Sequence, residues 1–519
     1  MIDCIVIGAG HNGLVTAAYL ARAGRSVLVL EASDRIGGAA ISAEVFPGMG
    51  ARLSKYSYLV SLLPSSIAED LAISVPLARR RVASYTPDPI DPSRGLLVPS
   101  SDADALAARI EAFTGSAKEA QAWRDFYSRT EAVARVLFPS LTEPLASRAD
   151  MRQQLDESDW HDFVERPLGE VLEKTFGDDV IRGVVLTDGL IGTFADAHDA
   201  SLHQNICFLY HVIGQGTGQW DVPVGGMGAI TAQLADRVRE AGGEIRTGAE
   251  VVAIDDDGTC VRLTVREGDQ ETIHIARTLA ANCAPAVLDR LRGRGSESID
   301  VPNAGAQVKV NMLLARLPRL RDESVDPKDA FAGTFHINEG YAQLAEAYRA
   351  AEAGALPSPL PAEIYCHSLS DPSILSEDLR EAGVQTLTLF GLHAPHALFT
   401  RGQYTREDVL AAVQATLDSV LAEPIADCLM LDANGEPCIE INTTIDLERD
   451  LRIPMGNIFH TPLSWPWAES DEEVGTWGVE TDSPIIAVCG SGAVRGGGVS
   501  GIPGHNAAKY LTSVLKTLR

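Results

Sequence analysis

A glycine-rich turn between a buried strand and a helix constrains the fold of this chain more than any other feature. Residues 4–7 (CIVI) form a short uncharged apolar run, which is typical of a strand buried on both faces. The next six residues, GAGHNG, follow the pattern GxGxxG at Gly8, Gly10 and Gly13. Residues 14–23 then place apolar or alanine side chains at helical spacing. We therefore predict a strand–turn–helix unit here.

A physical requirement explains why glycine stands at each of the three positions of the turn. Gly8 allows the tight turn, Gly10 lets a pyrophosphate approach the backbone, and Gly13 lets the helix pack on the strand. The helix N-terminus then faces the phosphates. A second apolar strand, residues 26–30, leads into Glu31, where a carboxylate is placed to accept hydrogen bonds from an adenosine ribose. This context predicts a bound dinucleotide, and an acid at this position disfavours the 2′-phosphate of NADP.

The residues that follow favour FAD over NAD. The segment DRIGGA places Arg35, Gly37 and Gly38 directly after the ribose-binding acid. Here the chain resembles the FAD-dependent amine oxidase and phytoene desaturase superfamily, whose members carry R-x-G-G at this point. The resemblance implies an FAD cofactor, with this turn running along the pyrophosphate toward the flavin.

Two further segments carry the same resemblance. EVVAI at 250–254 matches an E-V-x-x-I strand of the superfamily, which implies that the backbone of Val251 contacts adenine. Residues 483–518 again have the pattern of strand, glycine turn and helix. The resemblance implies that this last turn closes over the ribityl chain and the flavin ring. The cofactor contacts expected there are Gly490, Ser491, Gly498 and Val499.

Longer segments narrow the resemblance to phytoene-desaturase-like flavoproteins, and within these to the group called pyridine nucleotide-disulphide oxidoreductase domain-containing protein 2. They are residues 46–64, 208–231, 456–464 and 489–501. A disulphide reductase needs a second glycine turn for NAD(P)H and a redox cysteine pair. The eight cysteines form no CxxC pair, and the glycines at 214–218 lack a strand–turn–helix context. We therefore predict no nicotinamide site.

The fold class expected from these segments is α/β, with a Rossmann-like FAD-binding domain interleaved with a mixed α+β substrate domain. The FAD-binding domain is expected to comprise residues 1–65, 215–290 and 445–519, and the substrate domain 66–214 and 291–444. Periodicity places the other elements. Helices are expected at 103–135, 148–190, 230–241, 340–353 and 405–422, and strands at 244–246, 250–254, 260–265, 271–275, 306–315, 361–367 and 385–392.

The charge of the chain limits its partners. A net charge of −28 repels nucleic acid and anionic membrane surfaces. No uncharged apolar stretch is long enough for a membrane-spanning helix, and the first strand leaves no room for a leader, so a cytoplasmic location is expected. The expected partner is a small-molecule substrate. Apolar substrates are among the options, because residues 59–73 are apolar enough to line an entrance.

With FAD bound, the expected reaction is hydride transfer from a substrate C–H bond to flavin N5, catalysed by a dehydrogenase, desaturase or oxidase. The isoalloxazine ring carries out the difficult step, and the protein supplies orientation and excludes water. A flavin-dependent isomerase of an unsaturated substrate is an alternative. A less favoured one is a flavin-free protein that binds prenylated partners, which shares the fold but should lack the complete set of glycine turns.

Five residues are candidates for the substrate side of the flavin. His460 precedes the last FAD strand and is expected to face the ring, although a structural histidine fits equally. His211 matches a histidine that the family has before its second FAD motif. Tyr56 lies where the first segment leaves the FAD site. Trp465 lies in a loop expected over the flavin, and Arg495 lies in the last glycine turn.

Arg495 departs from the family pattern, because related desaturases usually have His-Pro before the glycine run. Its charge is expected to stabilise the anionic reduced flavin or to bind an anionic substrate. The alternative is an arginine that points to solvent or pairs with an acid. His203, Cys207 and His211 have a spacing that suits metal binding on a helix, but no fourth ligand follows. The sequence therefore predicts no metal site.

Overall fold

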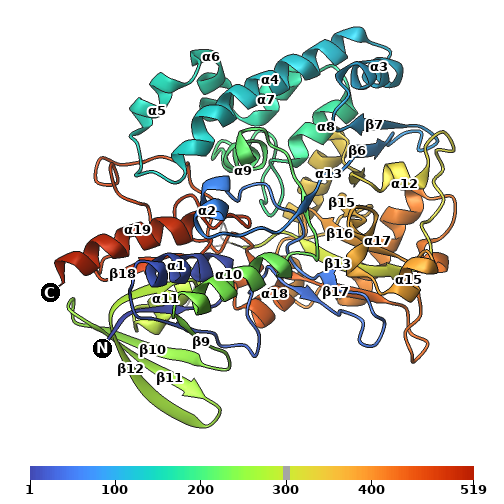
Figure 1. Ribbon diagram of the computed structural model, residues 1–519. Helices are drawn as coiled ribbons and strands as arrows, with labels where there is room; N and C mark the ends of the chain where they lie inside the picture. The colour runs from blue at the N-terminus through green and yellow to red at the C-terminus, as the bar shows by residue number, and fades with distance from the viewer. Residues whose placement is uncertain (296–303, 519) are drawn as a thin grey trace.

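The computed structural model describes residues 1–295 and 304–518, which form two sheets and a layer of helices (Figure 1). One sheet lies at the lower left of Figure 1 with both chain ends near it, the second lies at the right, and the helical layer covers the top. This arrangement confirms the predicted α/β class. The domain limits given above stay a prediction.

The first sheet has seven strands, with the order β10-β11-β12-β1-β2-β9 and with β18 beside β12. β1 pairs in parallel with β2 and β12, β2 pairs in parallel with β9, and β12 pairs in parallel with β18. β11 pairs antiparallel with both β10 and β12. The strand bounds are β1 Ile2–Ile7, β2 Val27–Leu30, β9 Glu244–Arg246, β10 Glu250–Asp256, β11 Val261–Glu267, β12 Gln270–Ala281 and β18 Ile486–Val488. All strands predicted for this region are confirmed, although β12 extends beyond the predicted 271–275 to Ala281.

Register aligns the carboxyl ends of four parallel strands. Ile7 of β1 pairs with Leu30 of β2 and with Ala281 of β12, and Ala281 pairs in turn with Val488 of β18. Ligands of open α/β sheets bind beyond these carboxyl ends. The helices packed near this sheet are α1 His11–Arg22, α10 Gly228–Glu240, α11 Pro285–Leu291 and α19 Ile502–Thr517.

The second sheet also has seven strands, in the order β17-β13-β16-β15-β14-β6-β7, and its only parallel pair is β14 with β6. Strand β13, which lies between β17 and β16, is buried at every position. The bounds are β6 Val82–Pro87, β7 Gly95–Pro99, β13 Val308–Leu314, β14 Thr334–Ile337, β15 Ala362–Tyr365, β16 Gln385–Gly391 and β17 Ile439–Asn442. The strands predicted at 306–315, 361–367 and 385–392 are therefore confirmed.

The helical layer is more broken than the sequence pattern predicts. The helix expected at 103–135 is two helices, because Gly115 adopts a φ of 72° and ends the first one. The run expected at 148–190 is interrupted by a π-helix at His161–Glu165 and by Pro167. The bounds are α3 Ala103–Thr114, α4 Ala117–Ser140, α5 Arg148–Gln154, α6 Glu157–Trp160, α7 Leu168–Thr175, α8 Asp179–Thr187 and α9 His203–Val212.

The remaining elements connect these three parts. The helices are α2 Ser65–Asp70, α12 Pro327–Ala330, α13 Tyr341–Glu352, α14 His367–Ser370, α15 Glu377–Glu381, α16 Ala397–Thr400, α17 Arg406–Val420 and α18 Thr444–Leu451, and the short strands are β3 Ser42–Ala43, β4 Leu53–Ser54, β5 Leu77–Ala78 and β8 Val222–Pro223. Short 3-10 helices occupy Gly214–Gly216, Pro372–Ile374, Ile425–Cys428 and Pro454–Gly456. Among the described residues, no helix is long and apolar enough to cross a membrane.

Candidate active site

The turn between β1 and α1 has the geometry that its glycines predict. A Cβ atom at Gly13 would lie 2.3 Å from the carbonyl oxygen of Gly8, so only glycine allows this helix to approach the strand. Gly8 adopts a φ of 89°. The N-cap of α1 is Gly10, which supplies no side-chain cap, and the first turn carries no acid. The first amides of α1 therefore point their N–H groups at a position suited to an anion.

The second glycine turn lies directly against the first. The amide of Gly37 donates to the carbonyl of Ala9 over 2.8 Å, and a Cβ at Gly38 would lie 3.3 Å from the Cα of Gly10. The side chain of Arg35 is exposed at the start of this turn. Residues 8–13 and 35–38 thus form one surface, although they are separated in sequence by a helix and a strand.

Glu31 is placed beside the same surface. Its Oε2 accepts a hydrogen bond from the amide of Ala9 over 2.7 Å, and its Oε1 accepts from the amide and hydroxyl of Ser33, each over 2.9 Å. The carboxylate is therefore held at the carboxyl end of β2, and its contact with a ribose stays a prediction. Val251 is buried in β10 of the same sheet, and its backbone contact with adenine also stays a prediction.

Asn282 joins the first and last glycine turns. Its Nδ2 donates to the carbonyl of Gly8 over 3.2 Å, and a Cβ at Gly490 would lie 3.2 Å from the Asn282 carbonyl oxygen. Gly490 and Ser491 follow β18, so both turns meet at the aligned strand ends. The sequence reasoning did not name Asn282, although a polar residue directly after the apolar residues 279–281 at the end of β12 was a usable signal.

The rest of the last turn lies between β18 and α19. Gly498 adopts a φ of 61°, and a Cβ there would lie 3.0 Å from a methyl carbon of Leu62. Val499 is buried. A Cβ at Gly504 would lie 2.2 Å from the carbonyl oxygen of Asn12, so α19 packs against the start of α1. The third predicted FAD segment therefore lies against the first.

Two neutral histidines lie beside these turns. Burial, together with the neighbouring His460, lowers the pKa of His11 to about 4. Burial also lowers the pKa of His460 to about 4. Nε2 of His11 and Nδ1 of His460 are buried and have no hydrogen-bond partner within the described chain. Buried ring nitrogens are normally satisfied, so these two atoms, next to three glycine turns, fit the polar groups of a bound cofactor.

Arg495 does not have the environment predicted for it. Its guanidinium donates to the backbone carbonyls of Ser140, Glu143 and Trp477, and its side chain is 1% exposed. It therefore neither points to solvent nor depends on a carboxylate partner, and its hydrogen bonds tie the last turn to the end of α4. Burial lowers its pKa to about 10. These contacts hold the last turn in place, and a role of Arg495 at the flavin or the substrate stays a prediction.

His211 is also held by its surroundings. It lies in the last turn of α9, where Nδ1 is 2.8 Å from the carbonyl oxygen of Cys207, and its ring stacks on Trp220 at 5.4 Å. Burial lowers its pKa to about 4. The helix predicted for His203, Cys207 and His211 is confirmed. In the parts of the chain that the structure describes, these three residues belong to no metal-ligand cluster.

The two other candidates pack against neighbouring rings or charges. Trp465 is 6% exposed and stacks on Trp467 at 5.0 Å. The hydroxyl of Tyr56 lies 3.5 Å from a carboxylate oxygen of Asp450, and Lys55 Nζ lies 5.3 Å from its ring centroid. Their roles at the flavin stay predictions.

The segment at Tyr56 connects the cofactor turns to the second sheet. The amide of Ser57 donates to the carbonyl of Ala39, next to the Gly37–Gly38 turn, over 3.2 Å. The Nζ of Lys309, in β13, donates to the carbonyl of Tyr56 over 3.0 Å and lies 4.4 Å from the ring centroid of Tyr58. Burial lowers the pKa of Lys309 to about 7.

Lys309 begins a row of side chains across four strands. Register pairs Lys309 of β13 with Phe390 of β16, Phe390 with Glu363 of β15, and Glu363 with His336 of β14. The ring of Tyr58 lies 4.7 Å from that of Tyr365 and 5.8 Å from that of His367. The sequence reasoning named none of the four residues of this row. One titratable residue in each of the three fully buried strands β13, β14 and β15 was the signal.

Comparisons with known proteins agree with this geometry. Residues 13–291, more than half of the chain, match the family model described as flavin containing amine oxidoreductase. The chain belongs to this family. It is an FAD-dependent oxidoreductase, which confirms the cofactor and the enzyme class predicted from the glycine turns.

Two relatives and one solved structure match the chain over nearly its whole length. An uncharacterized protein of Mycobacterium tuberculosis strain H37Rv, Rv0897c, is 50% identical over 100% of this chain and 98% of its own length. The mouse pyridine nucleotide-disulfide oxidoreductase domain-containing protein 2 is 28% identical over 99% of this chain and 94% of its own. A putrescine oxidase double mutant superposes with a TM-score of 0.59 at 14% identity, covering 100% of this chain and 98% of that one. This last likeness concerns the fold.

Proposed function

We propose that the protein dehydrogenates a small amine or alcohol on the face of the second sheet that carries Lys309. The observation that supports this most is the double attachment of residues 56–57, which bond to Ala39 beside the cofactor turns and to Lys309 on the sheet. Bound FAD supplies the acceptor for the hydride that leaves the substrate C–H bond. Sites between such a cofactor surface and a second domain are common places for substrates.

The residues that would hold FAD are those whose geometry fits it. The unpartnered ring nitrogens of His11 and His460 and the amides at the start of α1 are available to its polar groups. Because both imidazoles are neutral near pH 7, they would accept or donate hydrogen bonds without adding charge.

Lys309 is the residue proposed to handle the proton. An amine whose pKa is about 7 is present in both protonation states near neutral pH, which suits a group that accepts a proton and releases it again. When a substrate C–H bond loses a hydride, the adjacent N–H or O–H group becomes acidic. Nζ of Lys309, held between the Tyr56 carbonyl and the Tyr58 ring, would take up that proton.

Aromatic side chains would position the rest of the substrate. Tyr58, Tyr365 and His367 pack ring against ring, and Phe390 lies 6.4 Å from Tyr58. Burial lowers the pKa of His367 to about 3, so this wall carries no charge on its imidazole. Such rings exclude water and favour an apolar substrate body. The net charge of −28 favours neutral or cationic substrates over anions.

An apolar cavity is a candidate entrance. Its volume is about 310 Å³, and it lies between the 60–77 segment, the end of α4 and α10. Its lining includes Val60, Leu63, Ile73, Val75, Phe138 and Ile230. Three of these residues fall within the stretch 59–73 that the sequence suggested for this purpose.

Anaerobic flavin bleaching tests the proposal. The FAD-loaded protein is mixed with a panel of small amines and alcohols, and loss of flavin absorbance is followed. A bleaching substrate should react about 100-fold more slowly with Lys309→Met, the size expected when a proton-transfer group is lost. The FAD content should not change. Lys328→Met, which alters an exposed lysine, is the matched control and should react like the wild type.

Two results would contradict the proposal. Equal bleaching rates for wild type and Lys309→Met would remove Lys309 from the mechanism. A product that is an isomer of the substrate, formed without net flavin reduction, would replace dehydrogenation by the isomerase alternative.

A further inference from the structure

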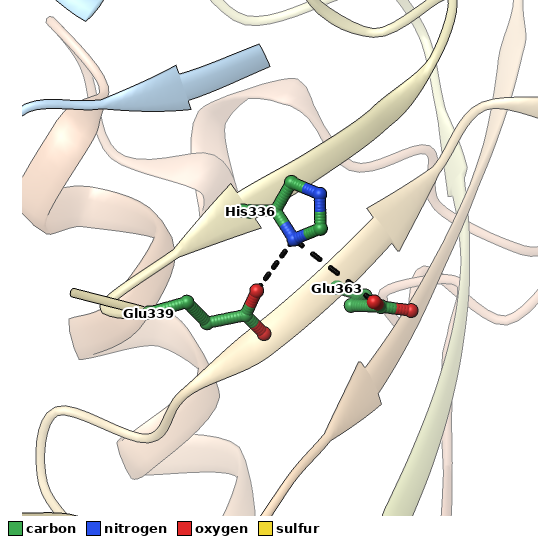
Figure 2. Close-up of side chains that lie close together, drawn as sticks. All are labelled: His336, Glu339 and Glu363. Atoms are coloured by element: carbon green, nitrogen blue, oxygen red, sulfur yellow. Dashed lines mark hydrogen bonds and ion pairs between the residues drawn. The ribbon is translucent and has the colours of Figure 1, made fainter. Parts of the chain in front are cut away.

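Three buried side chains at the far end of the Lys309 row converge on one point. They are His336 of β14, Glu363 of β15 and Glu339, which follows β14 (Figure 2). His336 Nδ1 lies 2.5 Å from Oε2 of Glu339 and 4.0 Å from Oε1 of Glu363. One ligand atom from each of the three lies within 4.8 Å of the others. We call these three residues the acid–histidine cluster.

The cluster is almost closed to solvent, yet it is not fully satisfied. Glu339 is 1% exposed and Glu363 is 5% exposed. Oε2 of Glu339 lies near His336 and 3.3 Å from the hydroxyl of Thr187, but Oε1 is buried and has no partner among the residues described. A buried, unpaired carboxylate oxygen is costly unless something absent from the protein chain binds it.

One further acid and one permanent cation lie near the cluster. A third carboxylate, that of Asp188 at the end of α8, is close enough to interact with Glu339 and Glu363, and burial is the main reason why its pKa rises to about 8. Against these three carboxylates stands one permanent cation, Arg80, which donates to Thr334 Oγ1 over 2.9 Å. In a metal-bound state, a divalent cation and the Arg80 guanidinium together would supply three positive charges against the three carboxylates.

We propose that the acid–histidine cluster is a binding site for one divalent transition-metal ion, with His336, Glu339 and Glu363 as ligands. A zinc ion bonds imidazole nitrogen and carboxylate oxygen at about 2.1 Å, which separates tetrahedral ligand atoms by about 3.4 Å. The two Nδ1–oxygen distances of 2.5 and 4.0 Å lie on either side of that value. Small side-chain rotations therefore suffice to seat the ion.

The donor set indicates which ions fit. One imidazole nitrogen with carboxylate oxygens suits Zn²⁺ or Mn²⁺, whereas Ca²⁺ and Mg²⁺ prefer oxygen ligands alone. The sequence predicted no metal site, because the three ligands lie on two strands and a turn and only the register of β14 and β15 brings them together.

The ion would add a link between two paired strands of the second sheet and the end of α8. Its ligands belong to β14, β15 and the turn before α13, and Thr187 and Asp188 bring in the end of α8. Glu363 also accepts a hydrogen bond from the hydroxyl of Tyr365, whose ring packs on Tyr58. An ion bound to Glu363 would therefore also help to hold the ring of Tyr365 and, through it, that of Tyr58.

Metal uptake by the FAD-loaded, tag-free protein tests this site without any turnover. The protein is stripped with a chelator, titrated with ZnCl₂ or MnCl₂ and assayed for bound metal, with CaCl₂ as the comparison ion. We expect about one Zn²⁺ or Mn²⁺ per chain and a rise in the unfolding temperature on binding. Glu339→Gln keeps the side-chain volume and should weaken binding by at least about 100-fold, since loss of an outer-shell partner alone costs 10- to 100-fold.

A second histidine–glutamate pair supplies the control. His198 Nε2 lies 2.9 Å from Oε1 of Glu173, but this pair is partly exposed and belongs to no group of three ligands in the described chain. Glu173→Gln should therefore leave metal uptake unchanged. If Glu339→Gln does not fold, as judged by FAD content, Glu363→Gln replaces it.

Three outcomes would overturn the proposal. In the first, the wild type would retain no Zn²⁺ or Mn²⁺ and its unfolding temperature would not respond to chelator or metal. The negative charge of the acids would then be neutralised by protons alone. The Glu339→Gln and Glu363→Gln variants bind metal as the wild type does, which would place the ion elsewhere. Ca²⁺ binds as well as Zn²⁺, which would exclude a ligating imidazole.

Discussion

Replacing Arg495 by methionine removes a charge but keeps a long side chain, and we expect the variant to lose stability rather than flavin chemistry. The guanidinium is the shared donor for the carbonyls of Ser140, Glu143 and Trp477, and methionine leaves all three without it. Each unsatisfied buried acceptor costs about 1–3 kcal/mol. Because the loops relax and a carbonyl tolerates partial satisfaction, we expect a total near the low end, about 3–5 kcal/mol.

Thermal unfolding of the FAD-loaded protein measures this loss. Unfolding entropy of about 2.1 cal/mol/K per residue gives about 1.1 kcal/mol per degree for a chain of 519 residues that unfolds as one unit. The unfolding temperature of Arg495→Met should therefore fall by about 3–5 °C. Arg349→Met is the matched control, because the exposed Arg349 donates to one carbonyl only, that of Ala345, and its loss should move the temperature by less than about 1 °C.

The reduction potential of the flavin and the KM for substrate complete the test. Both should stay at wild-type values in Arg495→Met at a temperature where the variant is folded. An unchanged unfolding temperature together with a lower potential or a raised KM would show that the charge faces the cofactor or the substrate, and would refute the reasoning from the three carbonyls.

Three further predictions follow from the site. Gly13→Ala should lose FAD, because the added Cβ meets the Gly8 carbonyl oxygen at 2.3 Å, whereas Gly268→Ala, with nothing within 4 Å, should keep its flavin absorbance. Burial lowers the pKa of Lys309 from 10.5 to about 7, so between these values unfolding takes up a proton; wild-type stability should rise with pH there by about 1.4 kcal/mol per unit relative to Lys309→Met in denaturant titrations. NADH or NADPH alone should not bleach the flavin anaerobically, because the glycines at 214–218 follow helix α9 rather than a strand; rapid bleaching would reveal a nicotinamide site.

The cofactor side of the molecule could be predicted from the sequence because its signals are local. The GxGxxG turn, the acid at Glu31 and the R-x-G-G turn each depend on neighbouring residues, and the structure brings them together as the strand register requires. Asn282 escaped notice because its role depends on contact with glycines more than 200 positions away in both directions.

The residues on the substrate side could not be predicted from local sequence patterns. Lys309, Glu363 and His336 each stand alone in a short apolar strand, and only the pairing of four strands places them in one row. The hydrogen-bond partners of Arg495 could not be predicted for the opposite reason. Its neighbours in sequence are flavin-type glycines, but its left-handed backbone, with a φ of 62°, sends the side chain to the carbonyls at the end of α4.

The pairing of β18 with β12 and of α19 with α1 has a consequence for biosynthesis. Thr16 of α1 donates to the carbonyl of Gly504 over 3.0 Å, so the first helix is completed by a segment translated hundreds of residues later. While the chain is still on the ribosome, one edge of β12 and one side of α1 have no partner. The three glycine turns can therefore come together only after residues 486–517 have been translated. On this geometry, we expect FAD to be captured only after that segment has packed on β12 and α1.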